Sequence, residues 1–246
     1  MLSRRSLIKT TLGAGTALGT AALLPAWARS AEQGNLGLPT LTGTQFDLTI
    51  DQFPVRLDGR AGLATGINGT LPGPLVRFRE GDDITINVTN NLEEDTSIHW
   101  HGLLVPFYMD GVPGVAFPGI KPGETFTYRW NLNHSGTYWY HSHYRFQEQT
   151  GLSGPFIIDA RSERHEYDEE AVIFLADWIN QSPEGIIPQI RGEQKSTSAT
   201  QPVPPGGYPF PGKEPFEVDL NYPGYLMNGH SNEKPFTLKA RKGDRI

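Results

Sequence analysis

From about Gln45 to Asp159, apolar and polar residues alternate with a period of two, and turn residues interrupt the alternation repeatedly. Two clear runs are residues 84–89 (Ile-Thr-Ile-Asn-Val-Thr) and 125–130 (Thr-Phe-Thr-Tyr-Arg-Trp). This pattern is typical of antiparallel strands with one buried face. Clusters of turn residues lie at 71–74, 80–82, 110–111, 121–124 and 135–136. We therefore predict an all-β Greek-key β-sandwich or barrel of roughly 110 residues.

A second domain is predicted after this one. The apolar run at residues 171–176 follows a charged stretch and resembles a first strand. A weak internal repeat supports two copies of one architecture, because residues 67–69 and 76–84 are echoed by residues 227–229 and 238–246. The echo stops at Ile246, where the first copy continues its strand to Val88. We expect a first domain at 29–165 and the beginning of a second at 166–246, truncated in mid-strand.

Residues 1–28 are typical of an export signal. Arg4 and Arg5 precede a weakly apolar run, Thr10–Leu24, and a small-x-small cleavage site follows at residues 26–28. The pattern resembles a bacterial twin-arginine signal and predicts a periplasmic protein. The alternative is a membrane anchor, but the run is shorter than the roughly 20 residues that a spanning helix needs. We therefore expect no membrane span after cleavage.

Charge and cysteine content narrow the function classes. The formal net charge is -6, and removal of residues 1–28 would leave 18 basic against 27 acidic residues. An acidic protein of this kind is a poor match for nucleic acid. The sequence has no cysteine, which excludes disulfides and thiolate ligands within these 246 residues. Any metal is expected to be held by nitrogen and oxygen atoms.

Two His-x-His motifs are the candidate metal ligands, His99-Trp100-His101 and His141-Ser142-His143. On a strand, residues i and i+2 share a face, so each motif directs two imidazoles to one side. Four convergent imidazoles suit copper, zinc, iron or nickel. The spacing leaves open whether one ion is shared or two are bound. The alternative is a set of histidines that are satisfied by hydrogen bonds and bind no metal.

Four ordered motifs carry a resemblance to a known family. They are residues 96–102 (Thr-Ser-Ile-His-Trp-His-Gly), 109–113 (Met-Asp-Gly-Val-Pro), 120–123 (Ile-Lys-Pro-Gly) and 136–143 (Gly-Thr-Tyr-Trp-Tyr-His-Ser-His). Together they resemble the first cupredoxin domain of multicopper oxidases, and especially the periplasmic copper-resistance oxidases of bacteria. The resemblance implies a cupredoxin-like fold, with one complete domain and the start of a second.

The resemblance also implies a trinuclear copper cluster at a domain interface, for which this chain supplies half of the ligands. By motif position, His99 would bind the type 2 copper. His101, His141 and His143 would bind the paired type 3 coppers, with the last two on different ions. Asp110 matches an acidic residue that helps to deliver protons to oxygen near the type 2 copper. The alternative for Asp110 is a turn aspartate before a glycine.

Two departures from the family limit what this chain is expected to do alone. The later His-x-x-His-x-His and His-Cys-His motifs are absent, and with them the thiolate of the type 1 copper site. We expect a periplasmic oxidase that oxidises Cu(I) or a phenolic reductant and reduces O2 to water, with a missing C-terminal cupredoxin domain. The 246-residue chain alone is expected to be inactive. The alternatives are a copper-sequestering module without turnover and a structural protein of the same fold.

Overall fold

A computed structural model describes residues 38–162, 166–190, 222 and 224–246. The predicted signal peptide at 1–28 lies outside these residues, so it remains a prediction. Among the described residues, no helix combines the length and the apolar character needed to cross a membrane. One α-helix is described, α3 (Pro183–Ile190), together with the 3-10 helix η1 (Phe107–Met109).

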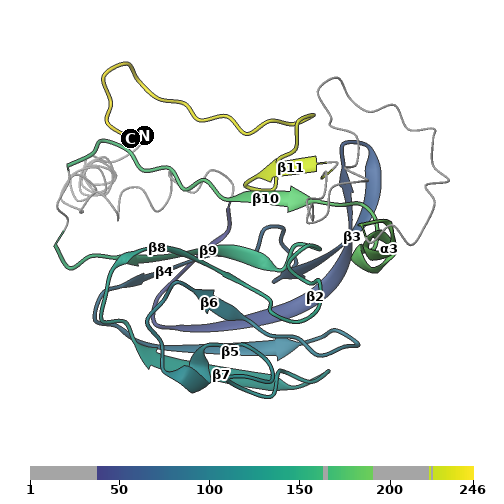
Figure 1. Cartoon of the computed structure of the whole chain (residues 1–246). Coiled ribbons are helices and arrows are strands. Elements are labelled where there is room, and N and C mark those ends of the chain that lie inside the picture. Colours follow the sequence, from purple (N-terminus) through teal and green to yellow (C-terminus); the bar gives the residue numbers. More distant parts are fainter. Residues whose placement is uncertain (1–37, 163–165, 191–221, 223) are drawn as a thin grey trace, which may run out of the picture. The chain divides into compact units, whose positions relative to one another are not determined.

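The described structure is built mostly of strands, which confirms the predicted all-β class (Figure 1). The first sheet has the order β1-β4-β9-β8-β6. Its strands are β1 (Thr40–Thr42), β4 (Leu75–Arg79), β9 (Ser153–Asp159), β8 (Gly136–His141) and β6 (His99–His101). The second sheet has the order β3-β2-β5-β7. Its strands are β3 (Arg60–Ile67), β2 (Gln45–Leu57), β5 (Asp83–Asn90) and β7 (Thr125–Asn131).

The two sheets face each other across one apolar core. In β5, Ile84, Ile86 and Val88 are buried, and the residues between them are half-buried. The same alternation buries Tyr128 and Trp130 of β7. Because successive side chains of a strand point to opposite faces, this period sends one set of residues into the core. The alternation in the sequence therefore identified the buried face of both strands correctly.

Strand pairing includes parallel contacts that the sequence pattern did not reveal. Strand β1 pairs in parallel with β4, β4 with β9, and β2 with β5. The other pairs, β2 with β3, β5 with β7, β8 with β9 and β6 with β8, are antiparallel. A buried ion pair fixes one of the parallel contacts, because Arg77 donates to Asp159 with its Nε at 2.9 Å from Oδ2. The sandwich is therefore a mixed fold, with hairpins joined by longer crossings.

The internal repeat corresponds to equivalent turns in the structure. Asn68 and Asn228 both adopt positive φ, 52° and 51°, and a glycine follows each. The Asn68 side-chain oxygen accepts from the Thr49 backbone N–H at 2.8 Å, and that of Asn228 accepts from Phe174 at 2.7 Å. Asparagine suits this turn because it tolerates the left-handed region. Both copies of the repeat therefore contain the same turn, closed by an asparagine side chain that accepts a backbone hydrogen bond.

The second half of the repeat is also matched. Asp82 accepts from the Arg79 backbone N–H at 2.9 Å, and Asp244 accepts from that of Arg241 at 2.8 Å. A glycine with positive φ precedes each aspartate. The repeat in the sequence therefore marks two pairs of turns with the same geometry.

Two compact units account for the described residues. One comprises residues 38–161, 173–190, 222 and 224–237, and the other includes residues 162, 166–172 and 238–246. The larger unit holds both sheets and a two-stranded sheet of β10 (Leu175–Trp178) and β11 (Gly224–Met227). Trp178 and Leu226 of this small sheet pack with Ala64 of β3 in a second apolar cluster. The predicted domain boundary at 165/166 remains a prediction.

Candidate metal centre

Antiparallel pairing of β6 with β8 brings the two His-x-His motifs together. In the register of this pair, His99 lies opposite His141, Trp100 opposite Tyr140, and His101 opposite Trp139. Residues directly opposite each other in such a pair share a face of the sheet. The first imidazole of each motif therefore projects to the same side, although His99 and His141 are 42 residues apart in the sequence.

The four imidazole rings gather in one group. The ring centroid of His99 lies 5.6 Å from that of His101, 5.5 Å from that of His141 and 4.7 Å from that of His143. His141 and His143 are separated by 4.9 Å. One ring nitrogen from each of His99, His101 and His141 lies within 4.8 Å of the other two. This is a donor set for a metal, and the assignment of its members as ligands remains a proposal.

Trp100 anchors the first motif from the opposite face of β6. Its side chain is fully buried in the core, with its ring centroid 5.2 Å from Tyr128 and 5.3 Å from Trp130. Tyr140, its partner on β8, is also fully buried and donates to the Pro74 carbonyl at 2.7 Å. The histidines are therefore held by residues whose burial fixes the orientation of both strands.

His99 is oriented by the backbone at Asp110. The Nδ1 atom of His99 lies 2.7 Å from the Asp110 carbonyl oxygen, and an N–H donor at Nδ1 leaves the Nε2 lone pair available. The Asp110 carboxylate is more distant, with Oδ1 at 3.5 Å from the same Nδ1. Gly111 follows with a φ of 77°, and its Cα faces the Ile98 carbonyl so closely that a Cβ would overlap it. The turn that the sequence predicts at 110–111 therefore lies directly against β6.

His141 has a carboxylate partner. Its Nδ1 lies 2.8 Å from Oε2 of Glu148 and 3.1 Å from the Ser142 carbonyl oxygen. The hydrogen bond from His141 lowers the pKa of the Glu148 carboxyl, and partial burial of that carboxyl opposes the effect. The other ring nitrogen of His141, Nε2, lies 3.2 Å from Nδ1 of His101. Trp139 stacks on the His141 ring at a centroid distance of 4.1 Å and an angle of 11°.

A buried amide holds the second motif in place. Gln147 is buried, and its Oε1 accepts from the hydroxyls of Ser142 at 2.8 Å and Thr96 at 2.7 Å. Its Nε2 donates to Glu94 at 3.0 Å and to the Asp95 carbonyl at 2.9 Å. All polar atoms of this side chain thus have partners, as a buried amide requires. This network fixes Ser142, the residue between the two histidines of the second motif.

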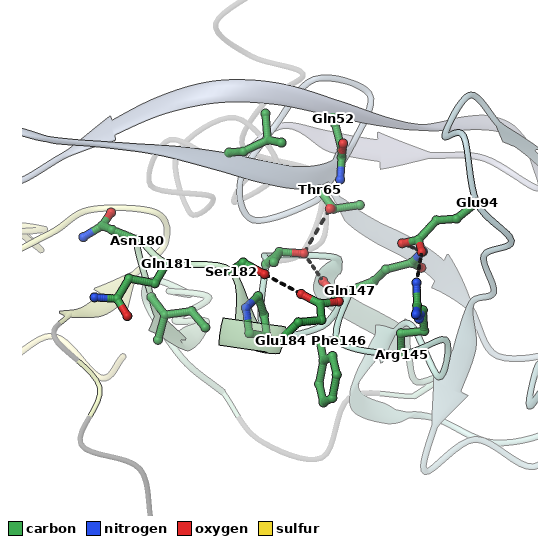
Figure 2. A pocket seen from close by; sticks show the side chains of 14 residues that line it. Gln52, Thr65, Glu94, Arg145, Phe146, Gln147, Asn180, Gln181, Ser182 and Glu184 are labelled. Atoms are coloured by element: carbon green, nitrogen blue, oxygen red, sulfur yellow. Dashed lines mark hydrogen bonds and ion pairs between the residues drawn. The ribbon is translucent and has the colours of Figure 1, made fainter. Parts of the chain in front are cut away.

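The other side of Gln147 borders a cavity of about 230 Å³ (Figure 2). In Figure 2 a dashed line joins Glu94 to Arg145, whose Nη1 lies 3.2 Å from Glu94 Oε2. Thr150 donates to Thr65 at 3.0 Å. These interactions pair four of the polar side chains that line the cavity. The cavity lies beside the hydrogen-bond network of Gln147 that supports Ser142. The four histidines are not among the residues that line it.

The environment of His101 and His143 favours neutral imidazole. Partial burial lowers the pKa of His101, and the neighbouring His141 and His99 lower it further. The pKa of His143 is also lowered, first by burial and then by His99 and His141. A neutral imidazole carries the lone pair that a metal needs, whereas a protonated ring has none. The four imidazoles fit copper, because copper accepts imidazole nitrogen ligands and the lowered pKa of His101 and His143 favours the form that binds a metal.

All five residues predicted for the site lie at this centre. The four histidines form the group, and Asp110 contacts His99 through its backbone carbonyl. Sequence reasoning missed Gln147 and Glu148, which hold the second motif from a segment outside the strands. In the sequence these two residues appear only as a polar pair shortly after His143. No periodic pattern distinguishes them from other polar residues of a loop.

Comparison with known proteins is consistent with this geometry. The sequence model of the multicopper oxidase family matches residues 50–163. Copper resistance protein A of Pseudomonas syringae pv. tomato is 47% identical over 188 residues, which cover 75% of this chain and 30% of that protein. Multicopper oxidase MmcO of Mycobacterium tuberculosis is 33% identical over 261 residues, covering 99% of this chain and 51% of that protein. The chain thus spans about a third to a half of these relatives.

Solved structures give the same result. The laccase from Botrytis aclada matches with a TM-score of 0.60 and 38% identity, over 78% of this chain and 32% of the laccase. Blue Copper Oxidase from Nitrosomonas europaea matches with a TM-score of 0.61 and 28% identity, over 83% of this chain and 58% of that oxidase. These likenesses, with the strand content, confirm the predicted cupredoxin-like fold.

Proposed function

Because this chain belongs to the multicopper oxidase family, we propose that it supplies four histidines to the oxygen-reducing copper cluster of such an enzyme. The proposed ligands are His99, His101, His141 and His143. The observation that carries the proposal is the gathering of their rings beside paired strands β6 and β8. We infer that the complete enzyme oxidises Cu(I) or a phenolic substrate and reduces O2 to water. The names of the relatives, copper resistance protein A and laccase, favour these two substrate classes.

The ligand positions support a division between type 2 and type 3 copper. Nδ1 of His101 and Nε2 of His141 approach to 3.2 Å, which favours one type 3 ion for this pair. His143 would then serve the other type 3 ion and His99 the type 2 ion. Bound copper would supply the redox chemistry by accepting single electrons and passing them to O2. The surroundings lower the pKa of His101 and His143, and hydrogen bonds fix the directions of the His99 and His141 rings.

Asp110 remains the proposed proton donor. Its carboxylate is 35% exposed and its Oδ1 lies 3.5 Å from His99 Nδ1, so it borders both solvent and the histidine group. A carboxylate in this position can relay protons, which the reduction of O2 consumes. In the complete enzyme, Asp110→Asn is expected to slow O2 reduction while copper content stays the same. A loss of copper in that variant would show instead that the side chain supports His99.

The surface beside the site supports a partner domain. Four large apolar side chains between residues 104 and 115 are 61% to 68% exposed. They are Leu104, Phe107, Tyr108 and Val115. Large apolar side chains exposed on one segment between the two histidine motifs are candidates for an interaction surface. We propose that a C-terminal cupredoxin domain of the complete enzyme covers them and completes the copper cluster, after export to the periplasm by the twin-arginine route.

Copper binding by the 246-residue chain tests the ligand assignment. We expect purified protein to retain copper after desalting, as measured by mass spectrometry of metals and by Cu(II) electron paramagnetic resonance. His99→Ala and His141→Ala should lose most of it. His134→Ala and His230→Ala are matched controls, because these rings lie outside the group, and they should bind as the wild type does. Equal copper retention by all four variants would refute the proposed site.

Measurement of oxygen uptake distinguishes an oxidase from a copper-sequestering module. The sequence contains no cysteine, so this chain has no thiolate of the kind that admits electrons to a type 1 copper. We therefore propose that the chain alone binds copper without turnover, which is also the behaviour of a sequestering module. O2 uptake with Cu(I) or a phenol, above that of a His101→Ala, His143→Ala double variant, would contradict this. In a complete enzyme the same double variant should abolish uptake, whereas a store would show none to abolish.

A further inference from the structure

Glu148 lies outside both motifs but reaches the most buried histidine of the site. The chain turns back after His143, and backbone hydrogen bonds from Gln147 to Tyr144 and from Gly151 to Glu148 define this turn. The Ser142 N–H then donates to the Leu152 carbonyl at 3.1 Å, which ties the end of the turn to the second motif. Glu148 is therefore placed beside His141 by a fixed local path.

The contact assigns the proton on the His141 ring. Nδ1 has two candidate acceptors, the Glu148 carboxylate at 2.8 Å and the Ser142 carbonyl at 3.1 Å. The carboxylate is both nearer and charged, and charge-assisted hydrogen bonds are roughly twice as strong as neutral ones. A proton on Nδ1 leaves the lone pair on Nε2, the atom that lies 3.2 Å from His101 Nδ1. The contact thus selects the tautomer whose free nitrogen faces the other ligands.

The ring is also restrained from its flat side. Trp139 stacks almost parallel to His141 at 4.1 Å and also stacks on His101 at 4.8 Å. Stacking limits tilting of the imidazole, but it allows the ring to turn within its own plane. The Glu148 hydrogen bond acts in that plane. The two contacts therefore restrain different motions of one ring.

We propose that Glu148 is a positioning residue of the copper site, which holds His141 in the Nδ1–H tautomer and directs its Nε2 atom toward the metal. This inference rests on the proposed function. A carboxylate behind a ligating histidine fixes the ring and raises its basicity, and loss of such a partner typically weakens metal binding by about 10- to 100-fold. Glu148 is not itself a proposed metal ligand, and it acts through its contact with His141.

Asp177 provides a matched control. It lines the same cavity of about 380 Å³ as Glu148. Within the described part of the chain, the Asp177 side chain forms no hydrogen bond with any of the four histidines. A substitution of Asp177 by Asn therefore removes one negative charge near the site without removing a contact to a ligand. Any effect of charge alone will appear in this variant too.

Copper affinity is the first measurement, made on the 246-residue chain by competition with a chelator. We expect Glu148→Ala to weaken binding at least tenfold and to change the Cu(II) resonance spectrum. Glu148→Gln retains an acceptor oxygen of similar reach, so it should recover part of the loss. Asp177→Asn should stay within about twofold of the wild type. If Glu148→Ala does not fold, as judged by circular dichroism, the comparison of Glu148→Gln with Asp177→Asn carries the test.

The tautomer is the second measurement, and it needs no copper. In metal-free protein labelled with 15N-histidine, the His141 signals, assigned with a His141→Gln variant, should show the proton on Nδ1. Glu148→Ala should shift them toward a tautomer mixture, whereas Glu148→Gln and Asp177→Asn should not. Unchanged signals and unchanged copper affinity in Glu148→Ala would overturn the role of Glu148. A wild-type chain that binds no copper would instead overturn the proposed function, so the two failures are distinguishable.

Discussion

Substitution of Gly111 by alanine tests how closely the turn at 110–111 supports the candidate metal centre. Gly111 has a φ of 77°, and an added Cβ would overlap the Ile98 carbonyl oxygen and approach the His99 Cα to 3.2 Å. Ile98 is fully buried and leads directly into β6. Because the obstructing atoms belong to the backbone, no side-chain rotation can relieve the overlap. The turn must move away from the strand that carries His99.

Gly114 provides the matched control. Its φ is 76°, nearly that of Gly111, but an added Cβ there meets nothing within 4 Å. An alanine in the left-handed region costs about 1–2 kcal/mol at either position. The effect of alanine on the unfolded chain is also common to both positions. The overlap at Gly111 adds about 1–3 kcal/mol, the usual cost of overpacking. Gly111→Ala should therefore lower the free energy of unfolding by about 2 kcal/mol more than Gly114→Ala does.

Urea unfolding followed by tryptophan fluorescence measures this difference, and copper titration measures its effect on the site. Gly111→Ala is expected to weaken copper binding, because the shifted turn carries away the Asp110 carbonyl that accepts from His99. Gly114→Ala should bind as the wild type does. Equal stability of the two variants would refute the close approach. Unequal stability with unchanged copper binding would refute the link between this turn and His99.

Three further predictions concern the scaffold, each measured by urea unfolding. Asp159→Ala should destabilise the protein by about 3 kcal/mol, because it removes the carboxylate that pairs with the buried guanidinium of Arg77. Trp100→Ala should cost about 3–5 kcal/mol, since it empties a fully buried site, and full retention of stability would contradict its anchoring role. Asn68→Ala should cost about 1–2 kcal/mol through the lost acceptor for Thr49 and the positive φ, and Asn68→Gly, which relieves only the φ, should cost less.

Much of the fold was predictable from the sequence because its signals are local. Alternation over residues 84–89 and 125–130 identifies buried faces, and Asp-Gly at 110–111 identifies a turn. The parallel pairing of β1 with β4 and of β4 with β9 was not predictable in this way. Those contacts depend on the path of the chain between strands, and a period of two is the same for parallel and antiparallel neighbours.

The candidate site shows the same limit at the scale of single residues. Strand geometry predicts that His99 and His101 share a face, but it does not give the register between β6 and β8. That the two motifs face one cluster came from the family resemblance, and the structure gives the register as His99 opposite His141. Glu148 and Gln147 were missed because they act from a turn. Their contacts depend on how residues 144–152 fold back, which leaves no periodic trace in the sequence.

The position of the proposed ligands depends on the core more than on β6 itself. This strand has three residues, so its pairing with β8 supplies few hydrogen bonds. A shift of the register by one residue would reverse every side chain, placing His99 and His101 in the core and Trp100 in solvent. Burial of Trp100 against Tyr128, Trp130 and Tyr140 opposes that shift. The tryptophan between the two histidines thus sets the register that directs both imidazoles toward the proposed copper site.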